Sequence, residues 1–160
     1  MSDNISIQRA AKLHPKIRNE VPTILAEIQS KGIGIRITQG LRTFEEQANI
    51  YNQGRTLPGK IVSNAKPGSS FHQYGCAVDF CLLHSDGSVS FSMSEDLNKN
   101  KLSDWKEVVN IFKSHGWSWG GDWVHSKDTP HFEKTFGHTW QDMLKLKEDK
   151  KVDNEGYVLI

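Results

Sequence analysis

The chain has 160 residues, of which 36% are hydrophobic, and its 20 basic against 19 acidic side chains give a formal net charge of +1. A chain of this length can bury about 70% of the surface that its unfolded form exposes, which excludes disordered proteins and small disulfide-stapled scaffolds. The balanced charge gives no general attraction to nucleic acid. No run approaches the roughly 20 apolar residues of a membrane span, so we expect one globular domain with neither a nucleic-acid partner nor a membrane span.

The first part of the chain is expected to form a helix followed by a strand. Apolar residues recur at helical spacing from Pro15 to Ile28, with Pro22 as the expected position of a kink, and Lys31-Gly32 supplies a stop. Residues 33–37 then alternate between isoleucine and glycine or arginine. This period of two predicts a strand with one buried face.

A second helix is predicted to begin after Thr43, which forms a capping box with Glu46. Arg42 therefore stands at the entrance of this helix, and Gly54 ends it. Residues 55–71 contain two Pro-Gly pairs and no sustained periodicity, so they predict a long loop. Loops of this length inside a compact domain are often functional.

The rest of the chain is expected to add a hairpin and two helices. Residues 74–83 predict a strand with Asp79 on one face, and Asp86-Gly87 predicts a turn into a second strand. Apolar residues at helical spacing predict helices around residues 105–112 and 140–144.

Two histidines and an acid stand out as candidate metal ligands. Asp79 lies in an otherwise apolar strand, where a buried carboxylate costs several kcal/mol unless it is paired or bound to a metal. His72 precedes it in a loop, and His131 lies in a second run, D-T-P-H. Two histidines and one carboxylate form a common zinc set that leaves a fourth position for water. We therefore expect His72, Asp79 and His131 to bind zinc.

Zinc chemistry on a peptide also needs groups that do not bind the metal. Hydrolysis needs a carboxylate that takes the proton of the attacking water and delivers it to the leaving amine, and Asp128, three residues before His131, suits that role. A fixed cation stabilises an oxyanion or a substrate carboxylate, and Arg42 is the expected one.

Three more residues are candidates for substrate binding: Gln47, Ser70 and Trp123. Each also has a structural alternative, because an exposed helical glutamine needs no role, a serine can stabilise a loop, and tryptophans mostly serve cores. Glu133, two residues after His131, fits either a group that orients a ligand or an ordinary salt bridge at a strand edge.

The run SFHQYGCAVD, residues 70–79, resembles the S-x-H-x-x-G-x-A-x-D pattern of the peptidase M15 (VanY-like) family. That family includes zinc D-alanyl-D-alanine carboxypeptidases, L-alanyl-D-glutamate endopeptidases and several phage endolysins. The likeness continues through QGLRTFEEQANIYNQGRTLPGKIVSNAKPGSS upstream and GGDWVHSKDTPHFE downstream, and it covers roughly residues 10–145.

The resemblance implies a small α+β fold of the Hedgehog/D-Ala-D-Ala metallopeptidase type, in which helices pack against an antiparallel sheet. It implies that His72, Asp79 and His131 hold Zn²⁺, that Asp128 is the catalytic acid and base, and that Arg42 binds or polarises the substrate. The implied partner is the peptidoglycan stem peptide. Aspartate in D-T-P-H, where other branches have glutamate, is typical of the endolysin branch that cuts the L-alanyl-D-glutamate bond.

On this resemblance residues 1–145 form a zinc peptidase catalytic domain. Residues 146–160 form a charged C-terminal tail with no separate wall-binding domain, and the chain is expected to be a monomer. The charges of residues 145–155 predict a solvated helix end and tail. The first ten residues, MSDNISIQRA, lack the basic and apolar regions of a signal peptide. We therefore expect synthesis in the host cytoplasm and action on the cell wall after holin-type release.

Three alternatives remain open at this stage. A D-alanyl-D-alanine carboxypeptidase would use the same metal centre with a different groove. A non-catalytic, zinc-stabilised binding module, as in hedgehog proteins, would keep the metal but would not need Asp128. A nucleic-acid binder rests only on the four lysines between residues 145 and 151, which alternate with acids.

Overall fold

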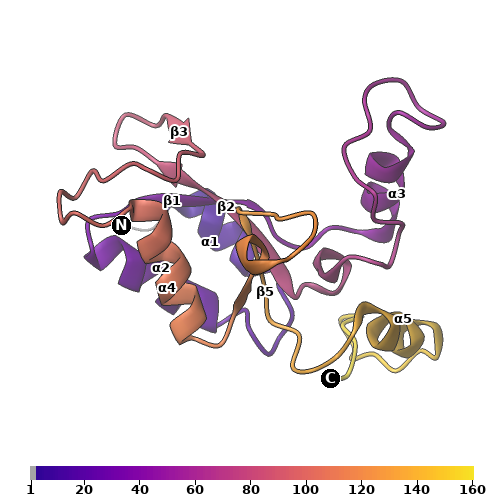
Figure 1. The fold of residues 1–160 in the computed structure, drawn as a ribbon. Helices are drawn as coiled ribbons and strands as arrows, with labels where there is room; N and C mark the ends of the chain where they lie inside the picture. The colour runs from indigo at the N-terminus through magenta and orange to yellow at the C-terminus, as the bar shows by residue number, and fades with distance from the viewer. Residues whose placement is uncertain (1–2) are drawn as a thin grey trace.

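A small antiparallel sheet lies at the centre of the computed structural model, which describes residues 3–160 (Figure 1). Along its main path the strands are β1 (Ile35–Gln39), β2 (Ala77–Leu83), β5 (His131–Glu133) and β4 (Ser118–Trp119), in that order. The short β3 (Val89–Ser90) forms the expected hairpin with the far end of β2. The expected α+β class with an antiparallel sheet is confirmed.

Five α-helices and two 3₁₀ turns surround the sheet in the described part of the chain. They are α1 (Asn4–Ala10), α2 (Glu20–Ser30), α3 (Phe44–Asn52), α4 (Asp104–Ser114), α5 (Trp140–Glu148), η1 (Phe71–Tyr74) and η2 (Gly120–Asp122). Within residues 3–160 the longest helices have 11 residues, and none of the helices is long and apolar enough to cross a membrane.

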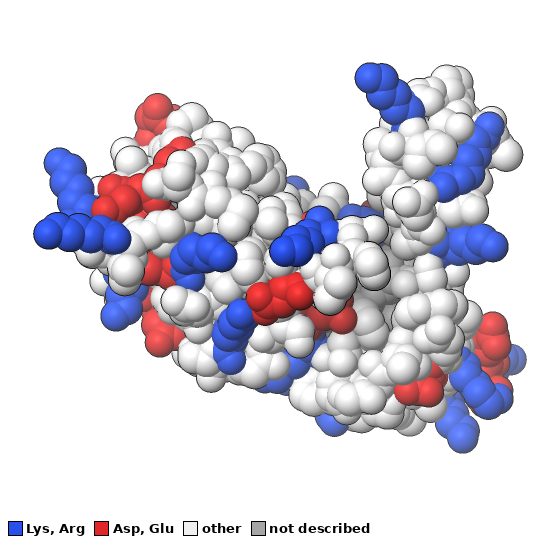
Figure 2. Space-filling view, viewed as in Figure 1, with Lys and Arg blue, Asp and Glu red and all other residues white. Residues whose placement is uncertain are grey.

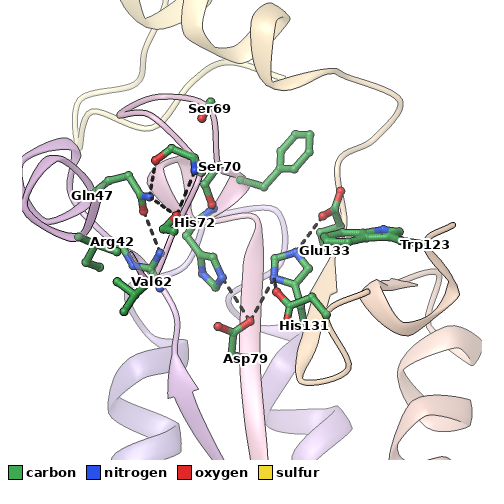
Figure 3. A pocket seen from close by; sticks show the side chains of 15 residues that line it. Arg42, Gln47, Val62, Ser69, Ser70, His72, Asp79, Trp123, His131 and Glu133 are labelled. Atoms are coloured by element: carbon green, nitrogen blue, oxygen red, sulfur yellow. Dashed lines mark hydrogen bonds and ion pairs between the residues drawn. The ribbon is translucent and has the colours of Figure 1, made fainter. Parts of the chain in front are cut away.

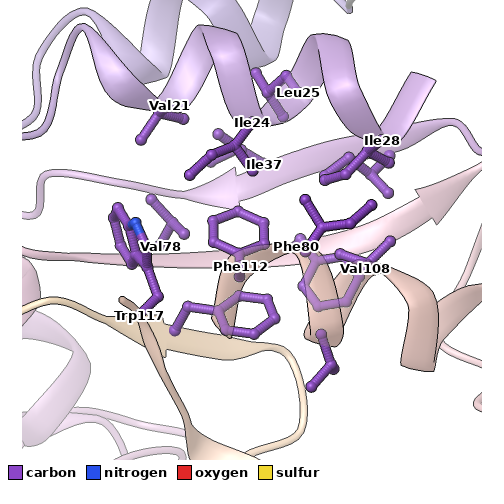
Figure 4. Packing of buried hydrophobic residues seen from close by; sticks show 14 of the residues in the cluster. Val21, Ile24, Leu25, Ile28, Ile37, Val78, Phe80, Val108, Phe112 and Trp117 are labelled. Atoms are coloured by element: carbon purple, nitrogen blue, oxygen red, sulfur yellow. The ribbon is translucent and has the colours of Figure 1, made fainter. Parts of the chain in front are cut away.

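The main core lies between one face of the sheet and the paired helices α2 and α4 (Figures 1 and 4). Apolar residues at helical spacing on α2, such as Ile24 and Ile28, are fully buried against this face. Phe80 of β2 and Phe112 of α4 fill the space between the layers, and both lie close to the ring of Phe132. Because alternate side chains of β2 point into this core, Asp79 points to the opposite face.

Two expectations about the first 30 residues are wrong. The helix expected from Pro15 begins at Glu20, and Pro22 lies in its first turn, where an amide has no helical partner to lose, so no kink is needed there. α1 was not expected at all. Asp3 caps α1 by accepting a hydrogen bond from the Ser6 amide, and Asp3 also pairs with Arg36 of β1.

Residues 145–155 are a mostly exposed helix end and turn, as expected, and α5 ends at Glu148. The residues that follow pack back onto the molecule: Val152 and Val158 form a β-bridge, and Val158 is only 2% exposed because it packs with Tyr74 and Met143 in a second apolar cluster. The apolar residues scattered among the charges of this segment supply the packing surface. The division of the chain at residue 145 stays a prediction.

Candidate metal centre

His72 lies in the 3₁₀ turn η1, which its local sequence defines. Ser70 precedes the turn, and its hydroxyl accepts a hydrogen bond from the His72 amide at 3.3 Å. Gly75 ends the turn with a φ of 70°, and a Cβ there would lie 2.7 Å from the backbone nitrogen of His14, so glycine is required. The buried imidazole of His72 has its Nδ1 atom 2.8 Å from the carbonyl oxygen of Gly40.

Asp79 and His131 face each other because β2 and β5 pair in antiparallel register at these two residues. The Oδ1 atom of Asp79 lies 3.3 Å from His72 Nε2 and 3.1 Å from His131 Nδ1 (Figure 3). All three ligand atoms lie within 4.8 Å of one another. The strand register and the η1 turn thus bring together the three residues expected to bind the metal.

The outer nitrogen of each imidazole has its own acceptor. His72 Nδ1–H donates to the Gly40 carbonyl, and His131 Nε2–H donates to Glu133 Oε1 at 2.8 Å. With both rings neutral, the two inner nitrogens therefore present lone pairs to the Asp79 carboxylate and no hydrogen lies among them. Outer hydrogen bonds of this kind orient histidine ligands in metal sites, so the donor set fits a cation such as Zn²⁺.

The pKa shifts of Asp79 and His131 also favour positive charge between the acidic side chains of the site. Burial raises the pKa of Asp79, but without a metal the carboxylate accepts hydrogen bonds from His131 and His72, which outweigh burial and hold the pKa well below its usual range. Burial lowers the pKa of His131, yet the Asp79 and Glu133 carboxylates together raise it to about 9. A proton on His131 therefore supplies the positive charge when no metal does.

Asp128 stands beside the three ligands on the turn that leads into β5. Its Oδ2 atom lies 3.9 Å from His131 Nδ1, and its backbone amide donates to the Gly120 carbonyl at 3.0 Å. A Cβ on Gly120 would lie 2.3 Å from the Asp128 carbonyl oxygen, so only glycine permits this approach. Burial raises the pKa of Asp128, and the Asp79 carboxylate raises it further. Both effects favour a carboxylate that readily accepts a proton.

The turn that carries Asp128 is held from behind by two indoles. Trp119 Nε1 and Trp105 Nε1 donate to the carbonyl oxygen of Thr129 at 2.7 and 3.3 Å. Trp119 comes from β4 and Trp105 from the start of α4, and both are buried. The position of Asp128 therefore depends on two separate elements.

Arg42 and Gln47 form a polar link between α3 and the metal ligands. The Arg42 amide donates to the His72 carbonyl at 3.0 Å, and Arg42 Nη1 donates to Gln47 Oε1 at 2.8 Å. Gln47 is fully buried and also donates to the carbonyl of Ala65 in the long loop. Among residues 3–160 the buried Nε of Arg42 has no hydrogen-bond partner.

These groups line one cavity of about 640 Å³. It lies between the body of the molecule and a lobe formed by α3 and the following loop, and Figure 2 shows the hollow that separates them. All eight residues expected at the site line the cavity: Arg42, Gln47, Ser70, His72, Asp79, Trp123, Asp128 and His131. The ring of Trp123 lies 5.2 Å from that of His131, so this tryptophan belongs to the cavity wall and not to the core.

The sequence gives no indication of some of the groups that complete the site. The Gly40 carbonyl orients His72, but a backbone oxygen leaves no residue signature. Ile50, Val62 and Ser63 add to the lining from α3 and the loop. A loop without periodicity does not reveal which of its side chains point inward, so only the structure identifies them.

Known proteins resemble this chain in sequence. A peptidase M15 family model, described as D-alanyl-D-alanine carboxypeptidase, matches residues 63–134. The peptidoglycan L-alanyl-D-glutamate endopeptidase CwlK of Bacillus subtilis is 48% identical over 121 residues, which cover 76% of this chain and 72% of that protein. The L-alanyl-D-glutamate peptidase of Listeria phage A118 is 28% identical over 136 residues, which cover 80% of this chain but only 40% of the phage protein.

Solved structures share the fold. An L-Ala D-Glu endopeptidase, ChiX, of Serratia marcescens superposes with a TM-score of 0.56 at 22% identity, covering 83% of this chain and 88% of that one. An L,D-carboxypeptidase, DacB, of Streptococcus pneumonia superposes with a TM-score of 0.51 at 19% identity, covering 89% and 74%. The 48% identity to CwlK, over 76% of this chain and 72% of that protein, and the match to the family model show that the chain belongs to the peptidase M15 family.

Proposed function

We propose that the chain is a zinc-dependent peptidoglycan hydrolase that cleaves the L-alanyl-D-glutamate bond of the stem peptide. The observation that carries the proposal is the convergence of His72 Nε2, Asp79 Oδ1 and His131 Nδ1, with the Asp128 carboxylate beside them and outside the ligand set. The printed activities of the Bacillus and phage relatives support the choice of bond. M15 peptidases are metallopeptidases, and a donor set of two nitrogens and one oxygen suits zinc.

A zinc ion bound by these three atoms would supply Lewis acidity, which acidifies water and polarises the scissile carbonyl. The chain's own residues do the rest. The Gly40 carbonyl and Glu133 fix the two imidazoles, so their lone pairs point inward. Asp128 takes the proton from the attacking water and passes it to the nitrogen of the leaving D-glutamate as the C–N bond breaks.

Arg42 is the proposed partner of negative charge on the substrate. Gln47 Oε1 holds one end of its guanidinium, and Arg42 lines the cavity. A cation oriented in this way can bind a stem-peptide carboxylate or steady the developing oxyanion. We propose that Ser70 and Trp123 contact the peptide from opposite walls of the cavity and that Gln47 positions Arg42.

The test is mass spectrometry of purified peptidoglycan fragments after incubation with zinc-loaded protein and with chelated protein. New D-glutamate amino termini that disappear with the chelator are the expected result. Released D-alanine would instead assign the chain to the D-alanyl-D-alanine carboxypeptidases, the activity that describes the family model. One bound zinc per chain without any new termini would favour a non-catalytic binding module.

We also propose that the protein is made in the host cytoplasm, reaches the wall through a holin-type lesion and acts as a monomer. The phage relative supports action on a cell wall after release. Expression with and without a holin tests the route, because lysis is expected only when both are present. Lysis without the holin would overturn the route, and light scattering of the purified protein would test the monomer.

A further inference from the structure

The loop before α4 carries a second set of oxygen-bearing side chains. It runs from residue 96 to residue 107 with the sequence DLNKNKLSDWKE, and none of its residues lines the 640 Å³ cavity. In Figure 1 the chain from β3 into α4 lies at the end of the molecule away from α3 and α5. Positions 1, 3, 5, 9 and 12 of this loop are Asp96, Asn98, Asn100, Asp104 and Glu107. This is the ligand spacing of a 12-residue EF-hand calcium loop, except that Lys101 replaces the usual glycine at position 6.

The backbone of the loop accommodates that replacement. Lys99 and Lys101 have φ values of 58° and 71°, so position 6 adopts the left-handed conformation for which glycine is normally used. The Asp96 carboxylate accepts hydrogen bonds from the amides of Asn100 at 3.1 Å and of Lys101 at 2.9 Å. The loop is therefore wound around the carboxylate of its first residue.

Glu107, at position 12, is folded back onto the loop from the first turn of α4. Its Oε1 accepts from the side-chain amide of Asn100 at 2.7 Å, and its Oε2 accepts from that of Asn98 at 3.0 Å. Both oxygens of a potentially bidentate ligand thus already face positions 3 and 5. Asn98 also donates to the Lys31 carbonyl at 2.9 Å, and Asn100 Oδ1 accepts from the Leu102 amide at 2.9 Å. A shared ion would therefore require both amide groups to rotate and to exchange these hydrogen bonds for bonds to the ion.

Asp104 supplies an observation that is independent of the loop geometry. Its side chain is 1% exposed, and its Oδ2 accepts from the Leu97 amide at 3.0 Å, which places the carboxylate inside the loop. Its Oδ1 is buried without a hydrogen-bond partner among residues 3–160. Burial raises the pKa of Asp104, and the carboxylates of Asp96 and Glu107 raise it further.

No basic side chain in the described residues neutralises this cluster. The ion pairs found across residues 3–160 include none with Asp96, Asp104 or Glu107, although Lys99 and Lys101 belong to the same loop. A buried, unpaired carboxylate oxygen among other acids is costly unless a cation compensates it.

We propose that residues 96–107 bind one Ca²⁺ ion. Its ligands would be seven oxygens: one each from Asp96, Asn98, Asn100 and Asp104, the carbonyl of Leu102, and both carboxylate oxygens of Glu107. Seven oxygen ligands suit Ca²⁺, whereas Mg²⁺ demands a smaller octahedral site and structural zinc sites prefer nitrogen and sulfur. The site is separate from the His72, Asp79 and His131 centre and does not depend on the proposed peptidase activity.

Trp105 makes the site measurable. It follows Asp104 in the loop, and its indole is one of the two that donate to the Thr129 carbonyl beside Asp128. A lanthanide that replaces calcium in the loop therefore lies next to a tryptophan that can transfer excitation energy to it. The same contact ties the start of α4 to the turn that carries Asp128.

The experiment titrates the full-length, zinc-loaded protein with Ca²⁺ by calorimetry and with Tb³⁺ by tryptophan-sensitised luminescence. We expect one ion per chain, with a dissociation constant for Ca²⁺ of about 10⁻⁵–10⁻³ M and displacement of Tb³⁺ by Ca²⁺. Glu107→Gln keeps the shape of the side chain but removes its charge, and it should weaken binding by about 100-fold or more. Glu148→Gln, which removes an exposed charge at the end of α5, and His72→Ala should leave Ca²⁺ binding unchanged.

Three results would overturn the proposal. The first is a folded wild-type protein that binds neither ion at about 10 mM Ca²⁺, a concentration above the weakest EF-hand affinities. The second is equal binding by the wild type and Glu107→Gln, and the third is binding that His72→Ala abolishes and Glu107→Gln retains. Asp96→Asn replaces Glu107→Gln if circular dichroism shows that the latter does not fold. None of these measurements uses peptide cleavage, so an inactive protein would not change the conclusion about Ca²⁺ binding.

Discussion

Asp128 is the acidic residue of the cavity whose side chain stays free for proton transfer. Asp79 is engaged by two histidines and Glu133 by one, whereas Asp128 lies 3.9 Å from His131 Nδ1. Asp128→Ala should therefore keep zinc bound and lower the cleavage rate by about 10²–10⁴-fold, the usual contribution of general acid–base catalysis. His72→Ala should lose both zinc and activity.

Metal analysis and the rate of stem-peptide cleavage check this prediction. Asp122→Asn is the matched control, since this exposed carboxylate pairs with Lys113 and does not line the cavity. A near-normal rate for Asp128→Ala would show that another group moves the proton.

Glu133 should act through His131 and not on the substrate. Its carboxylate fixes the imidazole by accepting the Nε2 proton, so Glu133→Ala should lower zinc affinity by about 10–100-fold. Glu133→Gln keeps an acceptor oxygen and should recover part of that loss. Competition with a chelator measures the affinity, and Glu95→Gln is the control because Glu95 and His84 form the same kind of pair at 2.8 Å outside the cavity. Equal losses in the two Glu133 variants would contradict the orienting role.

At the scale of elements, the C-terminal segment is joined to the start of the chain through a neutral histidine. His14 Nε2–H donates to the Val158 carbonyl at 2.8 Å, and His14 Nδ1 accepts from the Lys16 amide at 3.1 Å. Burial lowers the pKa of His14 below its ordinary value of 6.5. Protonation would place a hydrogen on Nδ1 and abolish the second bond.

The sign of the pH effect follows from that lowered pKa. His14 binds a proton more readily in the unfolded chain than in the folded one. The contribution of neutral His14 to the free energy of unfolding is therefore complete above about pH 6.5 and decreases as the pH falls below this value. We expect the melting temperature of the wild type to fall more steeply between about pH 6.5 and 5 than that of His14→Gln, with the largest loss of amide protection in residues 152–158. His138→Gln, at a more exposed histidine, is the control. Parallel pH profiles for the wild type and His14→Gln would disprove the link.

Elements with strong local signals could be predicted from the sequence, whereas elements that depend on distant contacts could not. The Thr43 and Glu46 capping box and the alternation in residues 33–37 gave α3 and β1 almost as observed. α1 has only seven residues, and it depends on β1, because the Ser6 hydroxyl accepts from the Ile37 amide. Such long-range bonds leave no periodic pattern.

The same distinction applies to the candidate site. His72, Asp79 and His131 could be proposed because their residue types and spacing match a zinc set, and the structure brings them together. Gln47 is a candidate from its position one helical turn after Arg42, and the two side chains do form a hydrogen bond. Its burial and its hydrogen bond to the Ala65 carbonyl, which lies 18 residues further along the chain, could not be foreseen.

At the scale of the whole molecule, the metal centre and the main core lie on opposite faces of the same sheet. Asp79 points away from the face on which α2 and α4 bury Phe80 and Phe112, so the core does not include the metal ligands. Removal of zinc should therefore abolish activity without unfolding the chain.

Free zinc at about 1,000 times its dissociation constant would stabilise the fold by about 4 kcal/mol, so chelation should lower the melting temperature by about 10 °C. Calorimetry measures the shift, and far-ultraviolet circular dichroism should remain unchanged at room temperature. Global unfolding on chelation would show that the centre is part of the folding core.

The Thr129 carbonyl accepts one hydrogen bond from Trp105 and one from Trp119. This shared acceptor links the substitutions that evolution can accept at the two tryptophans. A carbonyl oxygen has two lone pairs, and here two unrelated elements each use one. Replacement of either indole alone removes a buried core side chain but leaves the other donor, so the turn that carries Asp128 keeps one of its two hydrogen bonds. Replacement of both removes its support, and the two effects should not add. The two tryptophans thus form an epistatic pair, in which loss of one makes the chain intolerant of change at the other.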